Sequence, residues 1–353
     1  MKKSLSWMLV AIVTLVLALA GCGNQDEANE STETEGTNDE KTAEKVSIDV
    51  GMLKLTSTAP LFIAMEKGFF EEENLEVNAK WFEAAQPITV ATAGGSVDVG
   101  ATGITASLYN MVAGGQQLWI VADKGREQEG FSSSALLVPN DSEVTDPAGL
   151  KGKRIGITQT GSTFHYMAGR ILENHGLSLE DVQLVPLNSI KGLMEALSSK
   201  QVDAVILNEP NISTVEKEGY GKVITQVGEE MDYQTSGIFF SPKFAEDKDT
   251  AVRFLKVYAK ASNYYYDAVL TQEGGELVPG ENYDEVIEII AKYTDQDPEL
   301  IKLGLPYMDR DGKLLEEDIQ TQIDWYAKEK LIDKAIDVNE IVNTELLEEA
   351  LNN

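Results

Sequence analysis

Predicted strands alternate with predicted helices along most of this chain, and this alternation limits the possible folds more than any other feature. Residues 46–52 carry apolar side chains at every second position, which predicts a strand. Residues 59–68 follow as a helix, with Pro60 in its first turn and Gly68 at its end. The strand and helix pair recurs along the chain, so we expect an α/β fold with mainly parallel sheets and helices on both faces.

Two stretches of the sequence resemble each other and predict two similar lobes. Residues 88–103 and 192–210 each contain an amphipathic helix, a short turn, a Val-Asp pair and a strand. Asp98 and Asp203 occupy corresponding places in these stretches. A carboxylate at the entrance of a strand usually accepts hydrogen bonds from turn N–H groups, so we favour that role over catalysis.

The lobes are expected to be discontinuous in sequence. We predict that the chain crosses to the second lobe near residues 138–140 and returns near residues 235–237, before an apolar strand. From residue 241 the pattern is helical, and these helices are expected to pack on the first lobe. The expected divisions are a signal peptide (1–21), an acidic tether (22–45), the first part of lobe 1 (46–138), lobe 2 (139–236), and the rest of lobe 1 with C-terminal helices (237–353).

The N-terminal segment has the features of an export signal. Lys2 and Lys3 precede an apolar run over residues 5–20, which is too short to span a bilayer comfortably. Residues 23–45 contain no large apolar side chain. Such a segment cannot bury enough surface to offset its ordering entropy, so we expect a disordered tether.

Charge and cysteine content exclude several classes of function. The 59 acidic and 29 basic residues give a formal net charge of −30, which argues against binding to nucleic acid or anionic lipid. Cys22 is the single cysteine, so we expect no internal disulfide and no thiolate nucleophile. His165 and His175 lie ten residues apart, which is not the spacing of a helical zinc pair. We therefore expect neither metal nor cofactor.

Residues 19–22, Leu-Ala-Gly-Cys, resemble the lipobox of bacterial lipoproteins. The resemblance implies cleavage before Cys22, acylation of that cysteine, and anchoring on the outer face of the cell membrane, or on the periplasmic side in a Gram-negative cell. Two or more acyl chains are enough for stable anchoring. The alternative is an ordinary secretory signal with a chance cysteine.

Beyond the tether, the chain resembles the solute-binding proteins of nitrate, sulfonate, taurine and thiamine-pyrimidine ABC importers, including the NMT1/THI5-like group. The resemblance lies in "APLFIAMEKGFFEEENLEV", "AGGSVDVGATG", "LKGKRIGITQTGST", "EALSSKQVDAVILNEP" and "DGKLLEEDIQTQIDWYAKEKLI". It implies a two-lobed periplasmic-binding-protein type II fold with the ligand cleft between the lobes. It also implies permease and ATPase partners on other chains, and we expect a monomer.

In open parallel sheets, ligands bind beyond the carboxyl ends of the strands, where loops lead into helices. The candidate loops span residues 56–60, 101–105, 158–163, 187–190 and 207–210. Their candidate ligand-binding residues are Ser57, Thr58, Thr102, Gly103, Gly161, Ser162, Thr163, Asn188, Asn208 and Glu209. The sharpest candidate is the run 161–163, because glycine allows close backbone approach and both hydroxyls can donate; the alternative is that Ser162 or Thr163 only caps its helix.

The side chains near these loops suggest what the ligand is. Arginine is absent from the loops and lysine nearly so, whereas Glu209 offers acceptors to a ligand with N–H donors or else caps the next helix. Trp81 or Phe82 could stack on a planar ligand, but one of the two must face the core; Tyr166 is a weaker third candidate. We therefore expect a planar nitrogen compound, such as a thiamine-precursor pyrimidine, with aliphatic sulfonate, taurine or nitrate as alternatives.

Two other classes of function stay open at this point. Pyrimidine-forming enzymes share the resemblance, but they use a histidine and a cysteine-rich motif, and this chain offers only His165 in that region. A ligand sensor that signals to a membrane receptor is the other class. We expect transport and no enzymatic activity.

Overall fold

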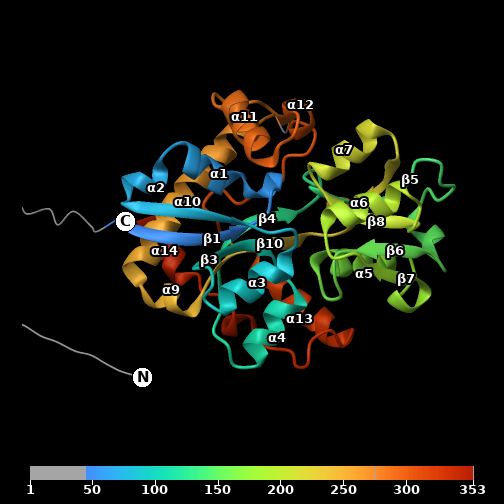
Figure 1. The fold of residues 1–353 in the computed structure, drawn as a ribbon, viewed down its shortest axis with the longest axis horizontal. Helices are drawn as coiled ribbons and strands as arrows, with labels where there is room; N and C mark the ends of the chain where they lie inside the picture. Colours follow the sequence, from blue (N-terminus) through green and yellow to red (C-terminus); the bar gives the residue numbers. More distant parts are fainter. Residues whose placement is uncertain (1–44, 275, 353) are drawn as a thin grey trace, which may run out of the picture. The chain divides into compact units, whose positions relative to one another are not determined.

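The computed structural model describes residues 45–274 and 276–352. The predicted signal peptide, Cys22 and nearly all of the predicted tether lie outside this part of the chain. Two five-stranded sheets with flanking helices organise the described residues, and each sheet forms the centre of one lobe (Figure 1). The predicted α/β class with two lobes is confirmed.

The first lobe contains a mixed sheet with the strand order β2-β1-β3-β10-β4. Its strands are β1 (Val46–Met52), β2 (Leu75–Trp81), β3 (Val99–Gly103), β4 (Trp119–Glu127) and β10 (Tyr233–Phe240). β1 pairs in parallel with β2 and β3, whereas β10 is antiparallel to both β3 and β4. All strands except β10 therefore run in one direction, and their carboxyl ends meet at the same edge.

The second lobe repeats this topology with the order β7-β6-β8-β5-β9. Its strands are β5 (Ser134–Pro139), β6 (Arg154–Ile157), β7 (Gln183–Pro186), β8 (Ala204–Asn208) and β9 (Gly221–Gln226). β6 is parallel to β7 and β8, and β5 is antiparallel to β8 and β9. The chain enters the second lobe with β5 and returns to the first lobe with β10, and these are the antiparallel strands of their sheets.

One hydrogen bond occurs at the same place in both lobes. Asp98 Oδ2 accepts from Asp49 N at 2.9 Å, and Asp203 Oδ2 accepts from Arg154 N at 2.8 Å; the partners are 49 residues apart in both cases. Each carboxylate thus satisfies a backbone N–H of a neighbouring strand, in the middle of β1 and at the start of β6, which is the role that we preferred over catalysis.

The crossings between the lobes lie earlier than we expected. β4 ends at Glu127 and the next strand, β5, already belongs to the second sheet. We placed the first crossing near residues 138–140 because we assigned β5 to the first lobe and did not foresee β4. The return is complete at Tyr233, where β10 begins, rather than at residues 235–237.

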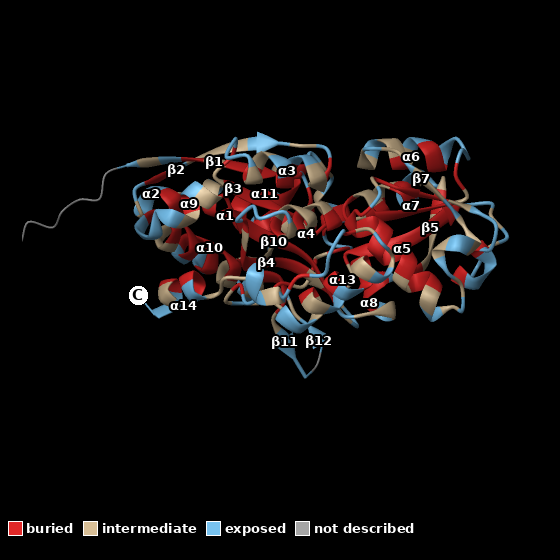
Figure 2. Ribbon diagram, turned by 90° about the horizontal axis from the view of Figure 1, so that it is seen from below, coloured by how far each residue is buried: buried red, intermediate tan, exposed pale blue. Residues whose placement is uncertain are grey.

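Helices cover both sheets, and their apolar sides are buried (Figure 2). Those of the first lobe are α1 (Ala59–Glu66), α2 (Phe69–Glu72), α3 (Ala85–Ala93), α4 (Ala106–Ala113), α9 (Pro242–Glu246), α10 (Lys248–Val269), α11 (Tyr283–Thr294), α12 (Pro298–Ile301) and α14 (Glu345–Asn352). Those of the second are α5 (Thr163–Asn174), α6 (Ile190–Ser198), α7 (Asn211–Glu218) and α8 (Val227–Glu230). Short 3₁₀ turns (Thr56–Thr58, Pro147–Leu150, Leu179–Asp181, Val338–Glu340) and a strand pair, β11 (Gln272–Glu273) and β12 (Glu276–Leu277), complete the elements.

Helix α13 (Glu316–Lys328), which precedes α14, contacts both lobes. We expected the helices after residue 241 to pack on the first lobe alone. Trp325 of α13 packs edge-on against Tyr166 of α5, with ring centroids 4.9 Å apart, and its Nε1 donates to Glu173 Oε2 at 3.3 Å. Tyr326 also packs near Tyr109 of α4 at 5.8 Å. The helix therefore bridges the lobes. Among the described helices, none is both long and apolar enough to span a bilayer.

Candidate ligand-binding site

A cavity of about 50 Å³, which we call the inner cavity, lies where the two lobes meet. It has room for roughly four water molecules, or for a compact polar group of similar size. Its polar lining residues are Thr56, Ser57, Lys124, Ser133, Thr158, Thr163, Asn208, Glu209, Thr235 and Ser236, and the others are Leu53, Leu55, Ala84, Ala85, Gly103, Phe164, Met167 and Ile190. Both lobes and both crossing segments therefore contribute to one site, as expected for a ligand held between the lobes.

The chain reaches this cavity through loops at the carboxyl ends of parallel strands. Thr56 and Ser57 form a 3₁₀ turn shortly after β1, and Thr163 starts α5 after β6. The loop before α5 turns at Gly161, whose φ of +75° favours glycine. Ser162 Oγ accepts from His165 N at 3.2 Å, so Ser162 caps α5, which was the alternative to ligand binding.

Lys124 is the one cation in the lining of the inner cavity, and sequence reasoning missed it. Its side chain is almost completely buried, and burial lowers the pKa of its ammonium group to about 7. Nζ donates to Ser57 Oγ at 2.9 Å, its one hydrogen-bond acceptor among residues 45–274 and 276–352. An ammonium group carries three N–H donors, so Lys124 retains donors for an acceptor placed in the cavity.

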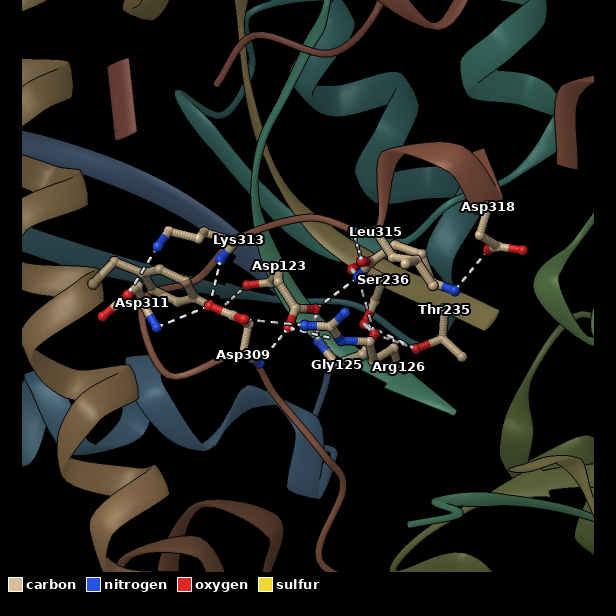
Figure 3. A network of polar contacts seen from close by, with 12 residues as sticks. Asp123, Gly125, Arg126, Thr235, Ser236, Asp309, Asp311, Lys313, Leu315 and Asp318 are labelled. Atoms are coloured by element: carbon tan, nitrogen blue, oxygen red, sulfur yellow. Dashed lines mark hydrogen bonds and ion pairs between the residues drawn. The ribbon is translucent and has the colours of Figure 1, made fainter. Parts of the chain in front are cut away.

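Asp123, the neighbour of Lys124 on β4, is held by donors of its own (Figure 3). Its carboxylate accepts from Gly125 N at 2.7 Å, from Gln234 Nε2 at 2.6 Å and from Asp309 N at 2.7 Å. Burial raises the pKa of Asp123. Asp123 pairs with Gly237 and Gly125 with Ser236, so Lys124 is an extra residue at a register shift of β4, and this network fixes the strand on both sides of it.

Glu209 lines the inner cavity, but both of its carboxylate oxygens already have partners. Oε1 accepts from Ser213 Oγ at 3.0 Å and Oε2 accepts from Ser213 N at 3.1 Å, so Glu209 holds the first turn of α7. Burial raises its pKa to about 6. Helix capping was the alternative role for Glu209, and each carboxylate oxygen still has a lone pair to accept a further hydrogen bond.

Trp81 and Phe82 lie outside the inner cavity, in an adjoining hollow of about 200 Å³. We call it the outer groove; Lys54, Trp81 and Phe82 of the first lobe line it opposite Ile190, Lys191 and Met194 of the second. Trp81 is 42% exposed, whereas Phe82 packs on the small apolar cluster of Leu53, Leu55 and Ile88. Of the two aromatic residues, Trp81 is the one that presents its ring outward.

The predicted residues that line the inner cavity are Ser57, Gly103, Thr163, Asn208 and Glu209. The others lie elsewhere for identifiable reasons. Thr58 donates its hydroxyl to Leu53 O at 3.0 Å, and Asn188, at φ +63°, donates its backbone N–H to Thr158 O at 2.8 Å in a turn. Thr102 is fully buried in β3.

Tyr166 belongs to the core rather than to the cavity lining. Its ring stacks on Tyr233 of β10 at 4.7 Å, and Arg170 Nη1 donates to its hydroxyl at 2.9 Å. Tyr166 does not line the inner cavity because α5 turns this face toward α13 and β10, and the sequence of α5 alone does not reveal that contact.

His165 is not one of the residues that line the inner cavity. Its Nδ1 accepts from Gly161 N at 3.0 Å, and burial lowers the pKa of the imidazole to about 4, so the ring is neutral at pH 7. Among the described residues, no group of three or more His, Cys, Asp or Glu side chains is arranged to hold a metal ion.

The lining residues that sequence reasoning missed come mainly from strands and crossings. Lys124 lies within β4, Ser133 precedes β5, and Thr235 and Ser236 belong to β10. A lysine shortly after the apolar run of residues 118–122 is the one signal that could have identified Lys124, because a charge inside a buried strand needs a partner.

A family model described as "NMT1/THI5 like" matches residues 55–268 of the chain. The chain is 29% identical over 361 aligned positions to the "Putative aliphatic sulfonates-binding protein" of Bacillus subtilis (strain 168), covering 99% of this chain and 97% of the relative. It is 33% identical over 165 positions to a "Putative thiamine biosynthesis protein" of Haemophilus influenzae, covering 46% and 49% of the two chains.

One solved structure of similar fold is the alkanesulfonate-binding protein SsuA from Xanthomonas axonopodis pv. citri bound to MOPS, with a TM-score of 0.70 and 22% identity. The alignment covers 85% of this chain and 99% of the other. The periplasmic nitrate-binding protein NrtA from Synechocystis PCC 6803 has a TM-score of 0.73 at 15% identity, covering 88% and 89%. At these identities the likeness shows the fold, which is that of the periplasmic binding proteins.

Proposed function

Because the chain belongs to the NMT1/THI5-like family, we propose that it is an extracytoplasmic solute-binding lipoprotein that captures a small organic anion, with a sulfonate preferred, and delivers it to an ABC importer. The relative from Bacillus subtilis, which is similar over nearly its whole length, is named as an aliphatic sulfonate binder. The role is capture and release by closure of two lobes, without bond making or breaking.

The observation that carries this proposal is the buried ammonium group of Lys124. Lys124 lines the inner cavity, its hydrogen bond to Ser57 uses one of its three N–H donors, and its buried position makes an unpaired charge costly. An anionic head group would pair with this charge and accept from the hydroxyls of Ser57 and Thr163. The sequence favoured a nitrogen compound over an anion because the loops contain almost no cationic side chain. Lys124, which lies in a strand, supplies a cation to the cavity.

The apolar part of the lining favours an organic anion over an inorganic one. Leu53, Leu55, Phe164, Met167 and Ile190 offer no hydrogen bonds, so the extra oxygens of a bare inorganic anion would be left unpaired against them. A sulfonate with a short alkyl chain matches both parts of the lining, since its head is anionic and its chain is apolar.

A second candidate ligand is the aminopyrimidine that we first preferred, because Glu209 and Asn208 both line the cavity. With a pKa of about 6, the Glu209 side chain is mostly ionised at pH 7 and can accept from a ring amine. In this case Glu209→Gln would weaken binding, whereas Lys124→Met would have little effect.

Calorimetry on the full chain decides between these ligands, in a detergent without sulfate or sulfonate groups. We expect ethanesulfonate to bind, and Lys124→Met to raise its Kd by about 10- to 100-fold, the usual value of a hydrogen bond to a charged group. Lys243→Met, on the exposed surface of α9, is the matched control and should bind like the wild type. Tight binding of an aminopyrimidine with no response to ethanesulfonate would favour the second candidate.

Delivery and anchoring need tests in cells. Deletion of the gene should abolish uptake of a labelled sulfonate; intact uptake with a lost cellular response would instead favour a sensor. Cys22→Ala should move the protein from the membrane fraction to the soluble one, because the acyl chains would be lost. An unchanged membrane fraction would contradict the lipoprotein proposal.

A further inference from the structure

The outer groove is joined to the inner cavity by a common apolar wall. Leu53, Leu55 and Ile190 line both hollows. Resting on the proposed function, we propose that the outer groove is a second subsite that binds the tail of the same organic anion, and that a planar aromatic tail fits it best. The ligand class is thus an arylsulfonate or a sulfonate of similar length, with its head at Lys124 and its ring at Trp81.

An arylsulfonate is larger than the inner cavity, so its ring needs a second hollow beside it. The inner cavity, of about 50 Å³, has room for a compact head group, whereas the outer groove measures about 200 Å³. Another large hollow also adjoins the inner cavity, but Glu209 is the lining residue that the two have in common. An apolar tail would meet the buried carboxylate of Glu209 on that side, so the wall of Leu53, Leu55 and Ile190 is the favourable way out.

Two aromatic side chains of the first lobe pack against Trp81 in the outer groove. Trp81 is the last residue of β2, where it pairs with Met52 of β1. Its ring lies 6.1 Å from that of Phe62 and 6.5 Å from that of Tyr293, and these two rings stack on each other at 4.7 Å. The indole is supported from behind while 42% of the residue stays exposed, which leaves area for a ligand ring.

Positive charge near Trp81 suits a ligand that carries a negative charge. Lys54 Nζ lies 5.8 Å from the centroid of the Trp81 ring, and no ion pair joins Lys54 to a carboxylate among the described residues. The side chain of Lys191 on the opposite wall is 80% exposed, with Glu195 Oε1 at 3.8 Å. Glu83 also lines the groove, so the tail itself should be apolar rather than a second acid.

The groove draws its walls from both lobes, which couples tail binding to closure. Trp81 and Lys54 belong to the first lobe, and Ile190 and Met194 to α6 of the second. A ring in this groove gains contacts with both lobes only when they are closed, so it should stabilise the closed form and raise affinity.

The test compares methanesulfonate with naphthalene-2-sulfonate by calorimetry on the full chain in the detergent described above. For the wild type we expect naphthalene-2-sulfonate to bind at least about tenfold more tightly, because stacking and apolar burial add to the same head-group contacts. Trp81→Ala should remove most of this ratio and Trp81→Phe should keep part of it. Val90→Ala, which changes an exposed apolar residue on α3 outside both hollows, is the control and should keep the full ratio.

The outcomes separate this inference from the proposed function. Equal affinities for the two sulfonates, or a preference for the aromatic one that Trp81→Ala does not reduce, would overturn the tail subsite and leave sulfonate capture standing. Absence of binding by both sulfonates would overturn the proposed ligand class and the subsite with it. A Trp81-dependent ratio supports both.

Discussion

Gly103 of the first lobe lies so close to Thr163 of the second that a Cβ atom at position 103 would stand 2.6 Å from Thr163 Cγ2. A second contact lies beside it, where Ala106 N donates to Gly161 O at 2.9 Å. These contacts join the lobes next to the inner cavity. The observed contact between the lobes therefore leaves no room for a side chain at position 103.

We predict that Gly103→Ala weakens solute binding because the added methyl group holds the lobes apart. Overpacking by one methyl group costs about 1–3 kcal/mol, so Kd should rise by roughly 5- to 150-fold. Thr163→Ser removes Cγ2 but keeps the hydroxyl, and the double variant Gly103→Ala/Thr163→Ser should recover most of the affinity of Thr163→Ser alone. Calorimetry measures all four proteins; a double variant no better than Gly103→Ala would contradict the contact.

The charge of Lys124 makes binding depend on pH. Its pKa of about 7 means that the solute-free protein loses this charge as the pH rises above 7. A sulfonate keeps its charge throughout this range and binds the protonated form, so its affinity should be nearly constant below pH 6 and fall by about 30-fold between pH 6 and 8.5. Titrations across this range should show no such slope in Lys124→Met; the same slope there would assign the effect to another group.

Glu127 forms hydrogen bonds across the first crossing between the lobes, residues 128–133, and should be important for stability. Its fully buried carboxylate accepts hydrogen bonds from Ser132 Oγ at 2.7 Å, Ser133 N at 2.9 Å, Ser133 Oγ at 2.9 Å and Ser134 Oγ at 2.6 Å. Glu127→Ala leaves these donors unpaired, so we expect the free energy of unfolding to fall by about 3 kcal/mol.

Urea denaturation provides the measurement for Glu127. Glu127→Gln keeps one acceptor oxygen, and the serine hydroxyls can rotate, so its loss should be smaller. Glu129→Ala, two residues further on and exposed, is the matched control. Equal stability of Glu127→Ala and Glu129→Ala would show that the serine cluster does not depend on the carboxylate.

The docking of α13 on the second lobe requires a glycine in α5. A Cβ atom at Gly169 would lie 2.3 Å from Trp325 Cζ2. Gly169→Ala should therefore destabilise the protein by about 1–3 kcal/mol through overpacking, against the gain of up to about 1 kcal/mol that alanine normally brings to a helix. Thermal or urea unfolding should show a loss, whereas Gly94→Ala, at the exposed end of α3 with φ of −81° and with its nearest contact at 3.2 Å, should show a smaller one. A stabilised Gly169→Ala would contradict this packing.

Much of the site was predictable because it lies where the secondary structure places it. The predicted residues that line the cavity end or follow parallel strands, and the carboxyl ends of such strands share one edge of the sheet; these residues are Ser57, Gly103, Thr163, Asn208 and Glu209. Lys124 was not predictable in this way, since it lies within β4 and reaches the inner cavity by the direction of its side chain rather than by its place at a strand end. The anionic ligand that we propose differs from the ligand expected from the loops for that reason.

Periodicity and turn residues by themselves determined the α/β class and the two repeated lobes, because apolar spacing is a local property that each strand and helix carries in its own sequence. The sequence also carries the Cys22 motif. Only the tertiary structure decided which strand belongs to which sheet, that α13 bridges the lobes through Trp325, and that Lys124 meets Ser57 inside the cavity. These facts depend on contacts between residues far apart in the chain, and such contacts form only when the whole core packs together.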